Sequence, residues 1–154
     1  MTSAAIYFED YVVGETRETQ GRTITETDVV FHAGHTGDFY PHHVDDEFAR
    51  TTPFGRRIAH GTMVFAIGIG LAAASRVNPV SFSYGYDRLR FVAPVFVGDT
   101  IRTRVTLAGK IDDAKRPTLG RVIERCEVVN QRGETVLVCD HLRAVERRTP
   151  LNQG

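Results

Sequence analysis

Residues 61–74 read GTMVFAIGIGLAAA, a stretch without a charged side chain. Apolar residues occupy every side of a helix of this length, which is typical of a helix buried in a core. The stretch falls short of the roughly 20 apolar residues that a membrane-spanning helix needs. Gly68 and Gly70 lower helix propensity, but they let a neighbouring element come close. The stretch therefore predicts a buried helix that packs closely against a sheet.

The sequence that follows this helix changes to a period of two residues. Ile101, Thr103, Val105 and Leu107 alternate with Arg102, Arg104 and Thr106. This alternation indicates a strand with one face in a core and one in water. Similar segments predict four long strands at residues 82–92, 100–111, 119–130 and 135–146, with turns near Pro94, Gly98 and Gly133. We expect these strands to form an antiparallel meander.

The sequence before the helix contains shorter elements. An extended segment is expected at residues 15–23. Thr25 and Asp28 resemble a capping box that begins a helix, and Gly37 ends it. A polar loop begins at Asp38, a short helix is predicted at residues 45–50, and a turn-rich stretch at 51–58. A single apolar helix followed by antiparallel strands packs most economically when the sheet curls around the helix. We therefore predict an α+β fold of the hot-dog type.

Length and charge limit the classes of protein. The 154 residues suit one domain, expected at residues 1–148 with a flexible tail at 149–154. The 19 basic and 19 acidic residues cancel, so no broad field favours nucleic acid or a membrane surface as a partner. The first eleven residues lack the apolar core and basic leader of a signal peptide, so we expect a cytoplasmic protein.

Two cysteines, Cys126 and Cys139, lie in strands that the turn at Gly133 joins. They could face each other, directly opposed or offset by one residue according to the turn type. In a reducing compartment, two buried thiols are expected rather than a disulfide.

The densest polar cluster is residues 37–43, GDFYPHH. Asp38 precedes His43 by five residues across a loop stiffened by Pro41. A carboxylate beside an imidazole can take a proton from water and deliver one to carbon near neutral pH, without a metal or organic cofactor. The alternative is that Asp38 only makes an Asx turn and that His43 is an ordinary surface residue.

A second cluster, residues 54–63 (FGRRIAHGTM), ends at the first turn of the apolar helix. The free N–H groups of Gly61 and Thr62 could hold a thioester carbonyl oxygen as it takes on enolate charge. Gly61 would also let a substrate approach closely. The alternative is that Gly61 is only a loop residue and that His60 or Thr62 caps the helix.

These two clusters, together with residues 86–100 (YDRLRFVAPVFVGDT), resemble the MaoC-like dehydratase family, which includes the (R)-specific enoyl-CoA hydratases. Asp38, Pro41 and His43 fall on the Asp, Pro and His of that family's motif. The resemblance implies that Asp38 and His43 are catalytic and that the N–H of Gly61 polarises the thioester carbonyl. It also implies reversible hydration of a trans-2-enoyl-CoA to an (R)-3-hydroxyacyl-CoA, no cofactor, and at least a homodimer.

Two positions depart from the family's motif: Tyr40 replaces the usual Asn and His42 the usual aliphatic residue. Tyr40 could shape a branched or polar acyl group, or it could only pack the loop. The residues expected to bind substrate are Tyr40, His42, Phe54, His60, Thr62, Met63 and Arg88.

Several alternatives remain open from the sequence. His32, His35, His42, His43 and His60 could bind a metal ion with Asp38 or Asp45, although no metal-binding signature is present. Arg56, Arg57, Arg88 and Arg90 could meet coenzyme A phosphates, or they could lie on a solvated strand face. The same fold could serve an acyl-CoA thioesterase or a non-catalytic module that binds an acyl thioester.

Overall fold

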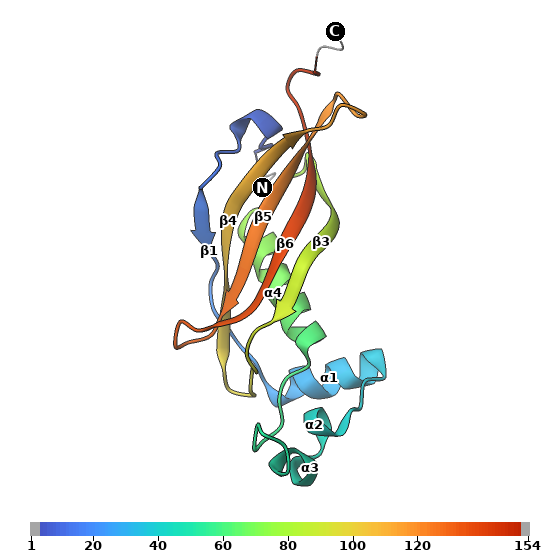
Figure 1. Ribbon diagram of the computed structural model, residues 1–154, viewed down its shortest axis with the longest axis vertical. Helices are drawn as coiled ribbons and strands as arrows, with labels where there is room; N and C mark the ends of the chain where they lie inside the picture. The colour runs from blue at the N-terminus through green and yellow to red at the C-terminus, as the bar shows by residue number, and fades with distance from the viewer. Residues whose placement is uncertain (1–3, 152–154) are drawn as a thin grey trace.

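The computed structural model describes residues 4–151 and shows one curved antiparallel sheet with a long helix on its concave face (Figure 1). Three shorter helices gather at one end of the sheet. This arrangement confirms the predicted α+β hot-dog fold. The elements are η1 (Phe8–Asp10), β1 (Thr16–Glu18), β2 (Arg22–Thr23), α1 (Glu26–Thr36), α2 (Pro41–Val44), α3 (Asp46–Arg50), α4 (Gly61–Ser75), β3 (Ser81–Phe91), β4 (Thr100–Asp112), β5 (Leu119–Val129) and β6 (Thr135–Glu146).

The four long strands lie within a residue or two of their predicted positions, but their order differs from a simple meander. The sheet runs β1-β4-β5-β6-β3, so that β4, β5 and β6 form a meander while β3 pairs with β6 at the far edge. The chain between β3 and β4 crosses the end of the sheet, where the carbonyl of Val95 accepts a hydrogen bond from the N–H of Ala59 at 2.7 Å. This crossing takes the chain from β3, at one edge of the sheet, to β4, which lies next to β1 at the other edge.

Helix α4 packs against the sheet through one face only. Gly68 lies in that face, because its carbonyl accepts a hydrogen bond from the Thr103 hydroxyl at 2.8 Å and a Cβ added to it would lie 2.5 Å from a methyl group of Val128. Gly70 is exposed with nothing within 4 Å of such a Cβ. The prediction of a helix buried on every side was therefore wrong for a single chain, since the sheet covers one side of it.

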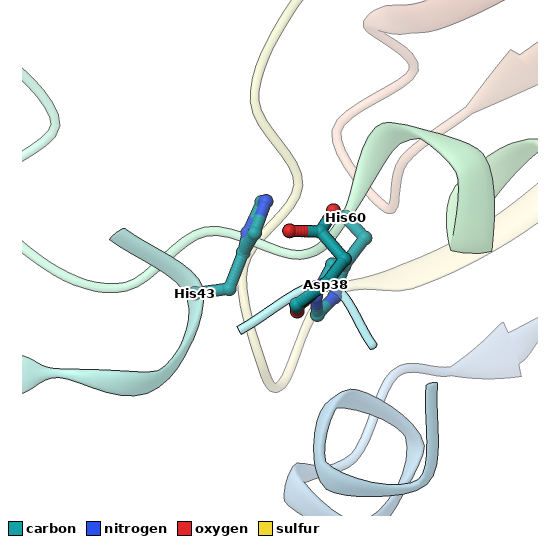
Figure 2. Close-up of side chains that lie close together, drawn as sticks. All are labelled: Asp38, His43 and His60. Atoms are coloured by element: carbon teal, nitrogen blue, oxygen red, sulfur yellow. Dashed lines mark hydrogen bonds between the residues drawn. The ribbon is translucent and has the colours of Figure 1, made fainter. Parts of the chain in front are cut away.

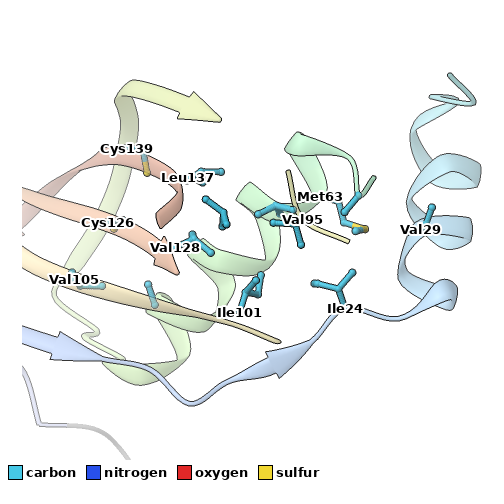
Figure 3. Packing of buried hydrophobic residues seen from close by; sticks show 14 residues of the cluster. Ile24, Val29, Met63, Val95, Ile101, Val105, Cys126, Val128, Leu137 and Cys139 are labelled. Carbon is cyan, nitrogen blue, oxygen red and sulfur yellow. The ribbon is translucent and has the colours of Figure 1, made fainter. Parts of the chain in front are cut away.

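The core between α4 and the sheet is formed by apolar side chains from α4, the strands and the β3–β4 connection (Figure 3). Cys126 and Cys139 lie within it, directly opposed in the register of β5 and β6, fully buried and free. The expectation of two buried thiols is confirmed. No helix in residues 4–151 is both long and apolar enough to cross a membrane.

A cluster of charged side chains lies at the opposite end of α4 from the three short helices. The buried carboxylate of Glu124 pairs with Arg17 at 2.8 Å and with Arg143 at 3.4 Å. His141 stacks on Tyr86 at 4.6 Å beside it. Burial lowers the pKa of His141 to about 4, so this imidazole is neutral at pH 7. These residues border a cavity of about 490 Å³.

Local sequence signals place the short helices. Thr25 and Asp28 form the predicted capping box of α1, and Gly37 ends that helix in the left-handed conformation at φ 78°. Pro41 occupies the first turn of α2, where the sequence predicts a loop, and the Asp45 carboxylate caps α3 through the N–H of Phe48. The predicted tail begins as irregular chain at residues 149–151, and its last three residues, 152–154, lie outside the described part.

Candidate active site

A pocket of about 450 Å³ opens at the N-terminal end of α4. Polar side chains of the loop before α2 and of α2 itself form one wall, and the chain between β3 and β4 forms another. The lining residues are Asp38, His42, His43, Phe54, Ile58, Ala59, Gly61, Thr62, Val64, Phe91, Val92, Ala93, Pro94, Val95 and Val136. The two polar clusters of the sequence therefore meet in one apolar pocket.

The side chains of Thr36 and His60 hold the backbone of Asp38. Its N–H donates to the Thr36 hydroxyl at 3.2 Å, and its carbonyl accepts from Nε2 of His60 at 2.9 Å. One carboxylate oxygen accepts the N–H of Tyr40 at 3.2 Å, which is the Asx turn considered from the sequence. The same carboxylate lies beside the imidazole of His43 (Figure 2), so the turn and a role in the pocket are compatible.

His43 is buried at the third position of α2, with 6% of its surface exposed. Its Nδ1 lies 2.7 Å from the carbonyl oxygen of Ile58 and its Nε2 lies 2.9 Å from Nε2 of His42. Burial lowers the pKa of His43, and the hydrogen bond to Ile58 offsets part of this effect. The neutral imidazole is thus favoured, which suits a group that exchanges protons near neutral pH. The alternative of an ordinary surface histidine is wrong.

His60 lies behind both residues and is 1% exposed. Its ring stacks on that of His43, with centroids 3.8 Å apart and planes at 24° (Figure 2). One donor atom each from Asp38, His43 and His60 lies within 4.8 Å of the others. Imidazole lone pairs lie in the ring plane, so nearly parallel stacked rings direct them side by side and not to a common point. This geometry is unsuited to joint coordination of one metal ion.

Gly61 is the first residue of α4, and the preceding His60 makes no side-chain cap. The alternative that His60 caps the helix is therefore wrong, because its imidazole turns to Asp38. Within residues 4–151, the N–H groups of Gly61 and Thr62 donate no hydrogen bond, as expected for a helix N-terminus. A Cβ on Gly61 would lie 2.9 Å from the ring of Phe91, so only glycine fits without moving that ring.

The structure brings most, but not all, of the predicted site residues to the pocket. Asp38, His42, His43, Phe54, Gly61 and Thr62 line it. Met63 lies in the core, and His60 supports the pocket from behind. The ring of Tyr40 packs against those of His42 and Phe48, outside the lining, as in the alternative that it packs the loop.

Arg88 lies away from the pocket. It pairs with the buried carboxylate of Asp140, which points to the sheet face opposite α4, because its neighbours Cys139 and His141 face the helix. The sequence could not show this, since the irregular register between Asp87 and Arg90 shifts the side chain alternation of β3. Arg57 is likewise held by Glu26 and Asp46.

The apolar wall of the pocket was not predicted from the sequence. Residues 92–95, between β3 and β4, supply much of it, together with Phe91 and Val136. Pro94 indicates a turn and belongs to the run that resembles the family, but neither signal predicts its place in the pocket wall. The crossing of this segment beneath the N-terminus of α4 depends on the strand order, which periodicity does not reveal.

Comparison with known proteins places this site in a family. The sequence model of the MaoC-like domain matches residues 9–126. Protein MaoC of Klebsiella aerogenes is 39% identical over 104 residues, which cover 68% of this chain but only 31% of that relative. An (R)-specific enoyl-CoA hydratase of Rhodospirillum rubrum is 38% identical over 109 residues, covering 71% of this chain and 74% of the hydratase.

The fold gives the same result. The X-ray structure of a monoamine oxidase regulatory protein from Archaeoglobus fulgidus superposes with a TM-score of 0.88 at 37% sequence identity, covering 94% of this chain and 97% of that one. The region matched by the family includes the loop of Asp38 and His43 and the first turn of α4. The chain therefore belongs to the family of MaoC-like dehydratase domains.

Proposed function

We propose that the protein is a hydro-lyase that reversibly hydrates a trans-2-enoyl thioester of coenzyme A to an (R)-3-hydroxyacyl thioester. The observation that carries this proposal is the meeting of a carboxylate, a buried imidazole and a free helix N-terminus in one apolar pocket. The name of the hydratase among the relatives supports the reaction class.

In the proposed reaction, a water molecule hydrogen-bonds the Asp38 carboxylate beside the imidazole of His43, since a carboxylate oxygen of Asp38 and a ring nitrogen of His43 lie within 4.8 Å of each other. The water gives a proton to the Asp38 carboxylate, and its oxygen forms a bond to the β-carbon. The electrons of the carbon–carbon double bond move toward the thioester carbonyl, whose developing negative charge the N–H of Gly61 stabilises. A proton from the His43 imidazolium then adds to the α-carbon, and the reverse sequence eliminates water.

The apolar wall suits the acyl chain of such a substrate. Phe91, Val95 and Val136 line the pocket, so apolar side chains would contact the acyl carbons. We expect the reaction to need no metal or organic cofactor, because Asp38 and His43 can exchange the protons themselves.

We also propose that two copies associate. Strand β3 is a sheet edge that pairs only with β6 within the described residues, and it exposes Phe82 and Tyr84. The outer face of α4 is apolar and exposed at Ala66 and Gly70. An open strand edge beside an apolar face favours pairing with a second copy about a two-fold axis. Light scattering on the purified protein tests this.

The test of the reaction combines three readouts with crotonyl-CoA as substrate. Loss of the conjugated enoyl absorbance measures hydration, a thiol reagent measures thioester cleavage, and chiral chromatography identifies the 3-hydroxy product. We expect loss of absorbance, no free thiol and the (R)-product. Release of thiol would indicate a thioesterase instead, and lack of turnover across linear, branched and dicarboxylic enoyl thioesters would indicate a binding module.

A further inference from the structure

The hydrogen bonds of His43 determine which of its nitrogens can react. The Ile58 carbonyl only accepts hydrogen bonds, so Nδ1 of His43, 2.7 Å away, must carry a proton. Every proton that His43 gains or loses therefore passes through Nε2. That nitrogen lies 2.9 Å from Nε2 of His42. In the neutral pair, His42 must be the donor of this bond, because His43 offers only a lone pair there.

We propose that His42 reloads His43 with protons during the hydratase cycle by direct transfer between the two Nε2 atoms. This inference rests on the proposed function, and it assigns a role to a residue that departs from the family's motif. His42 would act through His43 and is therefore a positioning and proton-relay residue.

The need for such a relay follows from the separation of the two reacting groups. When Asp38 takes the proton of the attacking water and Nε2–H of His43 protonates the α-carbon, one turnover leaves Asp38 protonated and His43 neutral. Asp38 is exposed and can return its proton to solvent. His43 is 6% exposed, and its reactive nitrogen contacts half-buried His42 at the pocket surface.

The transfer balances without any other reactant. Solvent adds a proton to Nδ1 of His42, and His42 passes its Nε2 proton to the Nε2 lone pair of His43. His43 becomes the imidazolium that the next turnover requires, while His42 is left as its neutral Nδ1–H tautomer. His42 then loses the Nδ1 proton to solvent and regains a proton on Nε2, which restores the starting pair. Repeated dehydration uses the same path in reverse.

The surroundings of His43 disfavour its protonated form. Burial lowers the pKa of His43 and the imidazoles of His60 and His42 act in the same direction, whereas the hydrogen bond to Ile58 and the charge of Asp38 raise it. His32 of α1 faces His60 at 4.8 Å and adds no negative charge. Among the described residues, Asp38 is thus the only anionic group that faces His43. The imidazole of His42 is less buried than that of His43, so His42 can receive the proton from solvent first.

The experiment compares His42→Gln and His42→Leu with wild type. Gln keeps a donor and an acceptor but cannot pass a proton, and Leu is the type of residue usual in the family's motif. We expect kcat at pH 8 in dilute buffer to fall about 10-fold or more in both variants, with KM little changed. Added imidazole should restore kcat in the variants and leave wild type unaffected. His35→Gln, on the exposed part of α1, is the matched control.

A second readout does not depend on turnover. NMR of ¹⁵N-histidine-labelled wild type should show His43 as the Nδ1–H tautomer and a coupling across the N–H···N bond to His42. Absence of that coupling, or full kcat in His42→Gln, would overturn the relay. A loss in both variants that imidazole does not restore would also overturn it, since His42 would then only support the fold. If wild type shows the coupling but hydrates no enoyl thioester, the proposed function has failed and the relay with it, while the pairing stands.

Discussion

Replacing each of two glycines of helix α4 with alanine tests how the sheet packs on this helix. Both substitutions add one methyl group to a helix interior, which contributes about 1 kcal/mol of helix propensity. At Gly70 the methyl meets nothing within 4 Å. At Gly68 it lies 2.5 Å from a methyl of fully buried Val128 and 3.4 Å from the Thr103 hydroxyl. Overpacking of this kind costs about 1–3 kcal/mol.

The propensity gain cancels when the two variants are compared, so Gly68→Ala should be about 1–3 kcal/mol less stable than Gly70→Ala. For a chain of this length, that difference lowers Tm by roughly 2–4 °C per kcal/mol. Thermal melts followed by circular dichroism at a fixed protein concentration measure this difference in Tm. In the Val128→Ala background, which removes the clashing methyl groups, Gly68→Ala should cost less stability than it does in wild type. Equal melting temperatures for the two single variants would refute this packing of α4.

Three further outcomes are expected. Gly61→Ala, which places a Cβ 2.9 Å from the Phe91 ring, should lower kcat/KM for crotonyl-CoA at least about 10-fold. Gly61→Ala/Phe91→Ala should regain part of the lost kcat/KM. An unchanged kcat/KM in Gly61→Ala would exclude substrate binding at the first turn of α4. Because burial lowers the folded-state pKa of His141 to about 4, the unfolded chain binds its proton first, so stability should fall as pH drops from about 6.5 toward 4. Urea titrations at each pH measure that slope, which His141→Gln should reduce. Glu124→Ala should cost about 3–5 kcal/mol of unfolding free energy, because it leaves the buried guanidinium of Arg143 without its carboxylate, and a loss below 1 kcal/mol would contradict that.

Much of the fold could be predicted because local chemistry determines it. The Thr25 capping box, the Gly37 helix end and the alternation along β4 depend on neighbours in the sequence, and the structure confirms them. The position of β3 beside β6 depends on a crossing that no periodicity encodes. The exposed face of α4 was missed for a related reason, since an apolar sequence does not show how much of a helix one sheet can cover.

The site divides in the same way. Residue types and spacing singled out Asp38, His43 and Gly61, the resemblance to the family's motif implied their catalytic roles, and the pocket brings the three together. A substrate role was predicted for Tyr40 because it replaces the usual Asn of the motif, and for Arg88 because guanidinium groups pair with phosphate. Their side chains instead contact Phe48 and Asp140, which only the tertiary structure could show.

The most direct test of the proposed function is the hydration rate of crotonyl-CoA by wild type and Asp38→Asn, assayed side by side. Asp87→Asn, at an exposed carboxylate on β3 outside the pocket, is the matched control. If Asp38 handles the proton of water, kcat of Asp38→Asn should fall about 100-fold or more while the control keeps the wild-type rate. A fully active Asp38→Asn protein would contradict the assignment of this pocket as a hydratase active site.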